Sequence, residues 1–86
     1  MIFQQTGAEA ARSLAALPVG TRARVVGLDG DDGVALRLLE MGLVPGVEVA
    51  LLKRAPLGDP LELRVRGFHL SLRYREAASV RVEVLT

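Results

Sequence analysis

The sequence predicts a mostly β fold: a small closed or nearly closed barrel of about five short strands, with one short helix between the first two strands and another near the N-terminus. Five short segments alternate apolar with polar residues, the pattern of strands that have one buried face. Between the first two, one segment has the helical period instead. A chain of 86 residues forms a single small domain, and closing its sheet removes exposed edges.

The composition excludes several classes of function. The chain has no cysteine, which rules out disulfides, zinc–thiolate sites, iron–sulfur clusters and cysteine nucleophiles. No apolar run approaches the length of about 20 residues that spans a bilayer, and the N-terminus lacks a signal-peptide pattern. Eleven Lys or Arg residues against ten Asp or Glu give a net charge of +1, which does not indicate nucleic acid as the partner. We expect a soluble cytoplasmic protein.

The N-terminal segment is expected to form a short helix. Thr6 and Glu9 have the spacing of a capping box, ahead of an alanine-rich run that reaches Leu17. An isolated helix of about ten residues is marginal in water, so this one would persist only by docking Leu14 and Leu17 on the barrel. We therefore divide the chain into an N-terminal extension, partly helical or frayed, and a barrel domain, at residues 1–13 and 14–86.

The barrel strands are expected where apolar and polar residues alternate. In the fourth strand, Phe68, Leu70 and Leu72 would face inward, and Gly67 would join it to the third strand as a hairpin. The last strand is expected to pair with the first and close the sheet. In chain order, the expected strands are Arg22 to Leu28, Val47 to Arg54, Leu61 to Arg66, Phe68 to Arg73 and Val80 to Val84.

The helix between the first two strands is expected to begin after Asp31 or Asp32, either of which can cap its first amides. Its core-facing stripe is predicted from the helical period to contain Ala35, Leu36, Leu39 and Leu43.

Leu38 and Met41 would then point away from that stripe, where a neighbouring loop or a partner could cover them. Gly42 would end the helix with a positive φ, and Leu43 would fold back as the apolar residue of the cap. Turns are predicted at Gly42, Gly46, Gly58, Pro60 and Gly67.

The sequence contains no catalytic or metal-binding constellation, so we predict no catalytic residue, cofactor or metal ligand. His69 is the only histidine and alternates outward, as an ordinary surface residue does. Asp29, Asp31 and Glu40 match three positions of a calcium loop, but the glycine that such a loop requires is replaced by Val34. There is no phosphate-binding loop for GTP.

Several basic residues could lie together on outward strand faces. Solvated faces explain them best, with an acidic protein surface as the next interpretation and nucleic acid or lipid phosphate after it. Few aromatic residues are present, so there is no stacking platform for single-stranded nucleic acid. These residues are Lys53, Arg54, Arg64, Arg66, Arg73 and Arg75.

A set of motifs in consistent order resembles the FeoA family, over the range from Leu14 to Val84. The motifs are Leu14 to Gly20, Arg37 to Gly46, Ala55 to Pro60, Val65 to Phe68, and Leu70 to Arg73 with Glu76 and Ala77. The resemblance implies an SH3-like β-barrel and a cytoplasmic accessory role in bacterial ferrous iron uptake. It also implies a partner, the membrane permease FeoB, whose cytosolic part is a GTPase domain; the protein could then lie at the inner membrane through that partner.

We therefore expect a non-catalytic regulatory module that binds FeoB. The contact is predicted on the helix and the following turn, with the proline-rich loop beside them; the same patch could support weak self-association. Its residues are Leu38, Met41, Leu43, Pro45 and Leu57. Two alternatives are a detached SH3-like domain of the kind found in metal-dependent repressors, and a small nucleic-acid-binding barrel, which the near-neutral charge disfavours.

Overall fold

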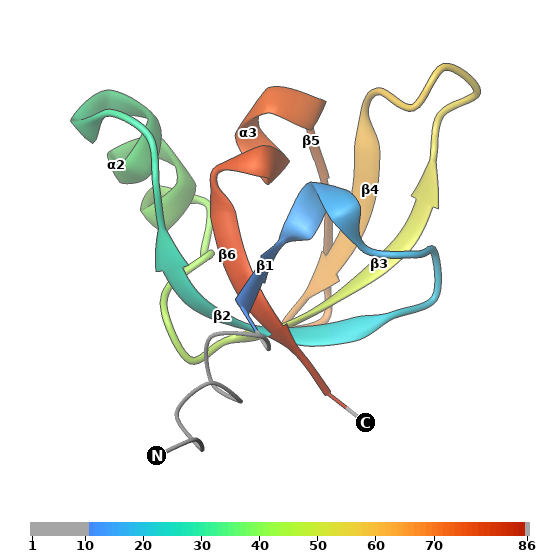
Figure 1. The fold of residues 1–86 in the computed structure, drawn as a ribbon, viewed down its shortest axis with the longest axis horizontal. Helices are drawn as coiled ribbons and strands as arrows, with labels where there is room; N and C mark the ends of the chain where they lie inside the picture. The colour runs from blue at the N-terminus through green and yellow to red at the C-terminus, as the bar shows by residue number, and fades with distance from the viewer. Residues whose placement is uncertain (1–10, 86) are drawn as a thin grey trace, which may run out of the picture.

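The computed structural model describes residues 11–85. A bent antiparallel sheet forms most of the molecule, and short helices lie over one end of it (Figure 1). The strand order is β1-β6-β2-β3-β4-β5, which confirms the mostly β fold, with six strands where about five are predicted. In chain order the elements are β1 (Ala11–Ser13), the 3-10 helix η1 (Leu14–Ala16), β2 (Arg22–Leu28), α2 (Asp32–Glu40), β3 (Glu48–Arg54), β4 (Leu61–Val65), β5 (Phe68–Leu72), α3 (Tyr74–Ala78) and β6 (Val80–Val84).

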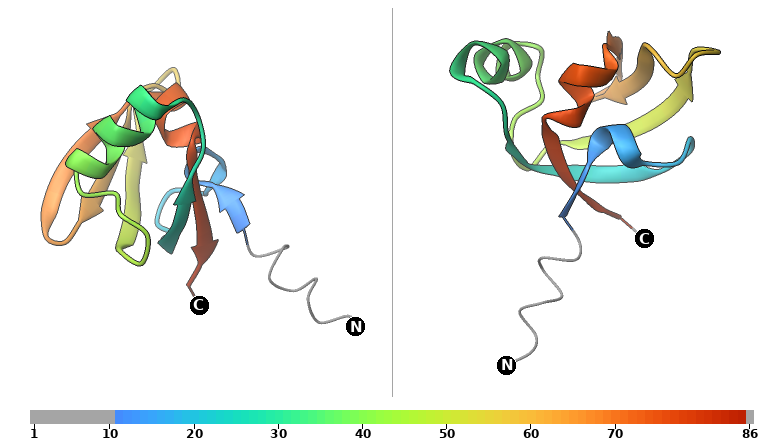
Figure 2. Two further views of the ribbon diagram at one scale, coloured as in Figure 1. Left: turned by 90° about the vertical axis from the view of Figure 1, so that its left-hand side faces the viewer. Right: turned by 45° about the horizontal axis from the view of Figure 1, so that its top comes forward.

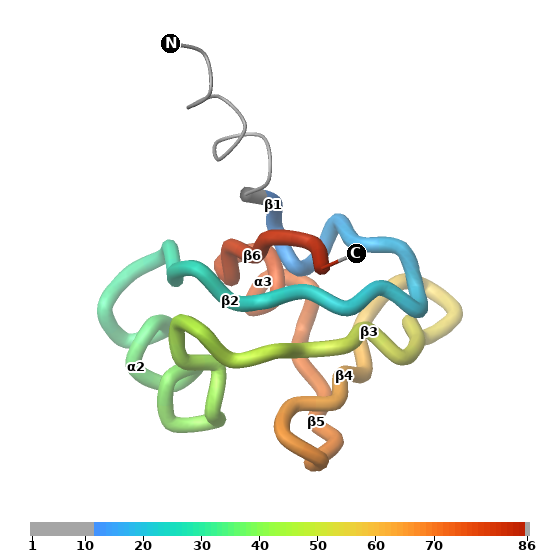
Figure 3. The backbone as a smooth tube through the Cα atoms, turned by 90° about the horizontal axis from the view of Figure 1, so that it is seen from below, coloured from blue at the N-terminus to red at the C-terminus, as the bar shows by residue number. Residues whose placement is uncertain are grey.

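The sheet is strongly curved, as the backbone seen from below shows (Figure 3). Its strands and helices enclose one apolar core. Strand β6 pairs with β2, so the last strand pairs with the first long strand as predicted. The expected closure of the sheet is not made by this pairing, because β1 continues the sheet beyond β6 and the strand order ends at β1 and β5. Within residues 11–85 every buried side chain is apolar, as expected when inward positions alternate with solvated ones. The largest fully buried side chains are Leu14, Leu17, Leu38, Leu43, Leu51, Leu61, Leu63, Leu72, Val25, Val49, Val80 and Val82.

The predicted N-terminal helix is wrong for its last residues. Ala11–Ser13 form strand β1, which pairs with β6. Leu14–Ala16 form a single 3-10 turn, and the amide of Ala15 donates a hydrogen bond to the side chain of Ser13. An alanine-rich helix of this length gains little by itself, whereas β1 shares backbone hydrogen bonds with the sheet. Leu14 and Leu17 are buried, as predicted.

The domain boundary is affected by this strand. Since β1 belongs to the sheet, the barrel begins within the segment assigned to the N-terminal extension. Thr6 and Glu9, the proposed capping box, lie outside the described residues.

Both ends of α2 are confirmed. Asp31 accepts a hydrogen bond from the amide of Val34 at 2.9 Å, and Gly42 has φ +103°. The predicted rotation of the helix is wrong: Leu38 is fully buried, whereas Leu36 is 57% exposed and Leu39 is 38% exposed. The helix carries apolar residues on most sides of its own surface, so the helical period is compatible with more than one inward face.

The hairpin of β4 and β5 has a two-residue turn. Arg66 and Gly67 have φ of +54° and +84°, and Val65 lies opposite Phe68. The predicted inward position of Phe68 is wrong, because its side chain is 72% exposed at the turn end of the hairpin, past the core. Leu72 is buried, Leu70 is partly buried and His69 is exposed, as the alternation predicts.

The turn glycines Gly42, Gly46, Gly58 and Gly67 all have positive φ, which confirms their predicted role. Pro60 follows a cis peptide bond and precedes β4. No helix within residues 11–85 is both long enough and apolar enough to span a membrane.

Candidate interaction surface

The predicted contact patch is not assembled as one exposed surface. Leu38 and Leu43 are fully buried, so a partner cannot reach their side chains. Met41 is partly buried against the core, whereas Pro45 is exposed and Leu57 is 96% exposed. The tip of the loop between β3 and β4, which carries Leu57, lies at the opposite end of the molecule from α2 in Figure 1 and in the right-hand view of Figure 2.

The end of α2 is the physical reason for this correction. The amide of Gly42 donates to the carbonyl of Leu39, and the amide of Leu43 donates to the carbonyl of Leu38, each at 3.0 Å. This pair of bonds is the Schellman motif, in which the apolar residue after the glycine packs on the residue five positions before it. Leu38 therefore turns inward together with Leu43.

Two exposed apolar side chains lie on α2 in their place. Leu36 and Leu39 are predicted as core residues but face outward, beside the exposed charged residues Arg37 and Glu40. An apolar pair with a charged rim is a common feature of protein interfaces. The sequence signal that identifies it is the Gly42 cap, since the Schellman pairing fixes Leu38 as the inward residue.

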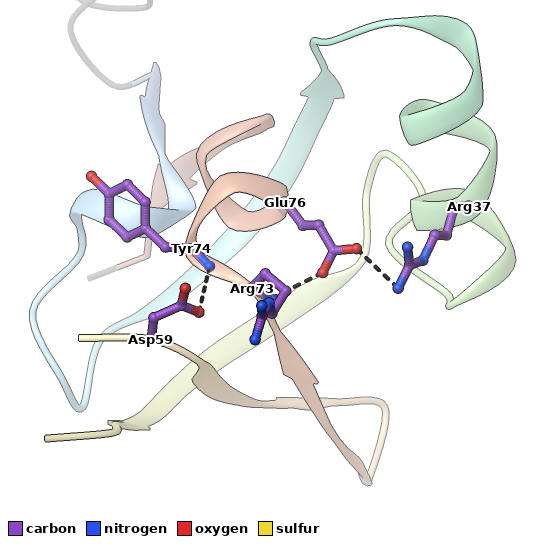
Figure 4. Close-up of polar contacts among 5 residues, drawn as sticks. All are labelled: Arg37, Asp59, Arg73, Tyr74 and Glu76. Atoms are coloured by element: carbon purple, nitrogen blue, oxygen red, sulfur yellow. Dashed lines mark hydrogen bonds and ion pairs between the residues drawn. The ribbon is translucent and has the colours of Figure 1, made fainter. Parts of the chain in front are cut away.

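A polar groove of about 490 Å³ lies between α2, α3 and the β3–β4 loop. Figure 4 shows that its side chains come from all three elements. Three arginines and three carboxylates line the groove, so its charges balance. Its lining residues are Gly30, Asp31, Val34, Arg37, Asp59, Arg73, Arg75, Glu76 and Ser79.

Glu76 connects two elements across this groove (Figure 4). Its Oε1 accepts a hydrogen bond from the amide of Arg73 at 2.9 Å, which caps the start of α3. Its Oε2 lies 3.1 Å from Nη2 of Arg37 on α2. The side chain of Glu76 is 14% exposed, whereas that of Arg37 is 66% exposed. The carboxylate of Glu76 thus caps α3 and also forms an ion pair with α2.

The β3–β4 loop is held by a second carboxylate. Oδ1 of Asp59 accepts a hydrogen bond from the amide of Tyr74 at 2.9 Å, which satisfies another free amide at the start of α3 (Figure 4). The loop is further closed by the amide of Gly58, which donates to the carbonyl of Ala55 at 2.7 Å. Leu57 is therefore displayed from an anchored loop.

The predicted basic residues are divided among separate places. Arg64 and Arg66 border a hollow of about 400 Å³ on the outer face of the sheet. Glu48 and Ala50 of β3 line the same hollow. Arg73 and Arg75 line the groove at the helical end instead.

Arg54 is not available to a partner as a surface cation. Its Nη2 donates to the carbonyls of Ala15 and Leu17, at 2.6 and 2.8 Å. Across residues 11–85, no three His, Cys, Asp or Glu side chains come together in an arrangement suited to a metal ion.

The match to a known family extends over nearly all of the described chain. The FeoA domain matches residues 12–84. The chain belongs to the FeoA family. One relative is a fusion protein of Porphyromonas gingivalis that joins an Fe(2+) transport protein A to an Fe(2+) transporter FeoB. It is 36% identical over 73 residues, which is 85% of this chain and 9% of the fusion protein.

Solved FeoA structures have the same fold. The FeoA-like protein of Clostridium acetobutylicum aligns with a TM-score of 0.84 at 36% identity, covering 90% of each chain. The FeoA of Stenotrophomonas maltophilia, an SH3 domain protein solved in complex with zinc, aligns with a TM-score of 0.71 at 36% identity, over 81% of this chain and 87% of that one. The SH3-like architecture implied by the motifs is thereby confirmed.

The fold also occurs inside larger regulators. A manganese-dependent transcriptional repressor aligns with a TM-score of 0.81, covering 87% of this chain and 37% of the repressor. The identity is 19%, so this likeness concerns the fold alone.

Proposed function

We propose that this FeoA-family protein is a non-catalytic accessory module that binds the FeoB permease on its cytosolic side and regulates ferrous iron transport. The main support is the Porphyromonas gingivalis relative, in which the two proteins form one chain. Fusion raises the effective concentration of one module at the other, which is useful only if the two act together. The S. maltophilia relative is described in terms of activating ferrous iron transport.

The proposed contact lies on the outer face of α2 and the turn after it. Leu36 and Leu39 supply exposed apolar surface there, and Pro45 is exposed in the turn. Met41 lies between them and is partly buried, so only part of its side chain is available. Leu38 and Leu43 would not contact the permease; as buried core residues they hold α2 in the orientation that exposes this face.

Regulation then requires a difference in affinity. A bound module shifts a permease only by the difference between its affinities for two permease conformations. A nucleotide-dependent contact would indicate a module that responds to the GTPase cycle, because nucleotide binding and module binding are then thermodynamically linked.

The first experiment is a pull-down of the purified chain with the full-length permease in detergent, without nucleotide, with GDP, and with a GTP analogue. Binding that changes with nucleotide supports a regulator and identifies the favoured state. Equal binding in all three conditions indicates an assembly factor. Absence of binding by a folded chain would contradict the proposal and return attention to the repressor-like and nucleic-acid alternatives.

Two matched variants locate the contact. Leu36→Asp changes the exposed face of α2, and Leu57→Asp changes an even more exposed leucine at the other end of the molecule. Both should fold, because neither side chain belongs to the core. The proposal predicts that Leu36→Asp weakens permease binding and that Leu57→Asp does not. The reverse result would place the contact on the β3–β4 loop.

A further inference from the structure

Strand β5 is a sheet edge without the usual protection. It ends the strand order, and its pairing with β4 runs without a register shift, so no bulge bends it away. Its sequence, Phe-His-Leu-Ser-Leu, contains no charged residue and no proline. Natural edge strands commonly carry one of these features because an open edge can pair with another chain. The opposite edge strand, β1, has only three residues and carries Arg12.

The hairpin turn determines which backbone groups of β5 point away from β4. Two successive positive φ values, at Arg66 and Gly67, are typical of a two-residue type I′ turn. Such a turn is closed by a hydrogen-bonded pair, here Val65 with Phe68, and bonded pairs then alternate along the ladder. Leu70 and Leu72 therefore bond to β4, whereas the amides and carbonyls of His69 and Ser71 face outward.

The next outward residue, Arg73, is already satisfied. Its amide donates to Glu76, and its carbonyl accepts from the amides of Glu76 and Ala77. For His69 and Ser71, in contrast, the described residues provide no backbone partner outside the hairpin. The open edge thus consists of two donors and two acceptors on residues 69 and 71.

We propose that β5 pairs with β5 of a second copy of this chain, antiparallel, about a twofold axis at Leu70. In this register His69 of each copy lies opposite Ser71 of the other, so all the outward groups form hydrogen bonds across the axis. Two copies of β5 can pair in this way without charge repulsion, because the strand contains no charged residue.

One side chain on the inward face also suits this register. Phe68, 72% exposed, lies opposite Leu72 of the other copy, whose side chain is already fully buried and offers no free surface. Leu70, which is partly buried, lies opposite its own equivalent. Apolar pairs across strands are stabilising. Pairing therefore satisfies the free backbone groups and covers the exposed part of the Leu70 side chains.

The test is the oligomeric state of the full chain by sedimentation over a range of concentrations, for the unchanged protein and two variants. Ser71→Pro removes an outward amide without removing a bond of the hairpin, and proline is tolerated at such edge positions. Ser71→Ala keeps the amide and is the matched control. The dimer should dissociate about tenfold or more readily with Ser71→Pro, because each copy loses one hydrogen bond. Ser71→Ala should leave the association unchanged.

Amide hydrogen exchange tests the same edge without any substitution. Exchange at His69 and Ser71 should slow as the protein concentration rises, whereas the amide of Leu70, bonded within the hairpin, should be protected at every concentration.

A chain that stays monomeric at millimolar concentration would overturn the proposal. A dimer that is insensitive to Ser71→Pro, with unchanged exchange at His69 and Ser71, would also overturn it by placing the contact elsewhere. The proposal is independent of permease binding, since β5 and the exposed face of α2 are different surfaces.

Discussion

The amide of Leu43 donates a hydrogen bond to the carbonyl of Leu38 at 3.0 Å, and both side chains are fully buried in the core. This relationship sets the rotation of α2 on the barrel. It turns Leu36 and Leu39 outward, so the exposed apolar face of the helix follows from how the helix ends.

The two leucines of α2 should differ sharply when truncated. Leu38→Ala should lower the free energy of unfolding by about 2–5 kcal/mol, because it leaves a cavity in the core. Leu36→Ala should change it by less than about 0.5 kcal/mol, since the side chain is mainly in water. Urea denaturation of both variants measures the difference. Equal losses would mean that the helix is rotated differently.

Two glycines near the ends of α2 should respond to alanine with opposite signs. Gly42→Ala should destabilise the protein by about 1–2 kcal/mol, because φ +103° is unfavourable for a residue with a Cβ, although the Cβ itself would meet no neighbouring atom. Gly33→Ala, inside the helix, should stabilise by about 0.5 kcal/mol. Thermal unfolding reports both, and a loss of stability in Gly33→Ala would contradict the helix-propensity argument.

The two bonds of Glu76 should contribute unequally. Glu76→Ala removes the cap on the Arg73 amide and should cost about 1–2 kcal/mol. Arg37→Ala removes only the ion pair to a mainly exposed guanidinium and should cost less than about 0.5 kcal/mol. Chemical denaturation at low and high salt separates them: the Arg37 contribution should fall with salt, and the cap should persist. A cost for Arg37→Ala equal to that for Glu76→Ala would make the ion pair the dominant bond.

Arg54 should be important for attaching the N-terminal segment to the barrel. Arg54→Ala deprives the carbonyls of Ala15 and Leu17 of their donor and should cost about 2–3 kcal/mol. The neighbouring Lys53→Ala, which removes an exposed pair with Glu62 at 4.0 Å, should change stability by less than about 0.5 kcal/mol. Denaturation midpoints compare the two. A small effect of Arg54→Ala would mean that water replaces the guanidinium at these carbonyls.

The strands of the barrel follow from local pattern. The alternation in Leu61–Val65 and Val80–Val84 has period two, so when one side chain faces the core, every second side chain of the strand faces the core as well. Turn glycines such as Gly42 and Gly67 can also be predicted from the sequence, because a positive φ is favourable for glycine, which has no Cβ, whatever its neighbours are. The family match adds the SH3-like architecture and the link to ferrous iron transport.

Local pattern was insufficient where several arrangements satisfy it. Apolar residues surround most of α2, so only the packing of Leu38 with Leu43 selects its inward face. Ala11–Ser13 become a strand because β6 is adjacent in space, which helical propensity cannot anticipate.

Position along the chain also does not show which residues lie close together in space. Leu57 and the residues of α2 are separated because the tip of the β3–β4 loop and α2 lie at opposite ends of the barrel (Figure 1). The sequence by itself therefore determined the periods, the turns and the family. Only the tertiary structure decided which apolar residues remain in water, since burial depends on neighbours that the chain brings together from far apart.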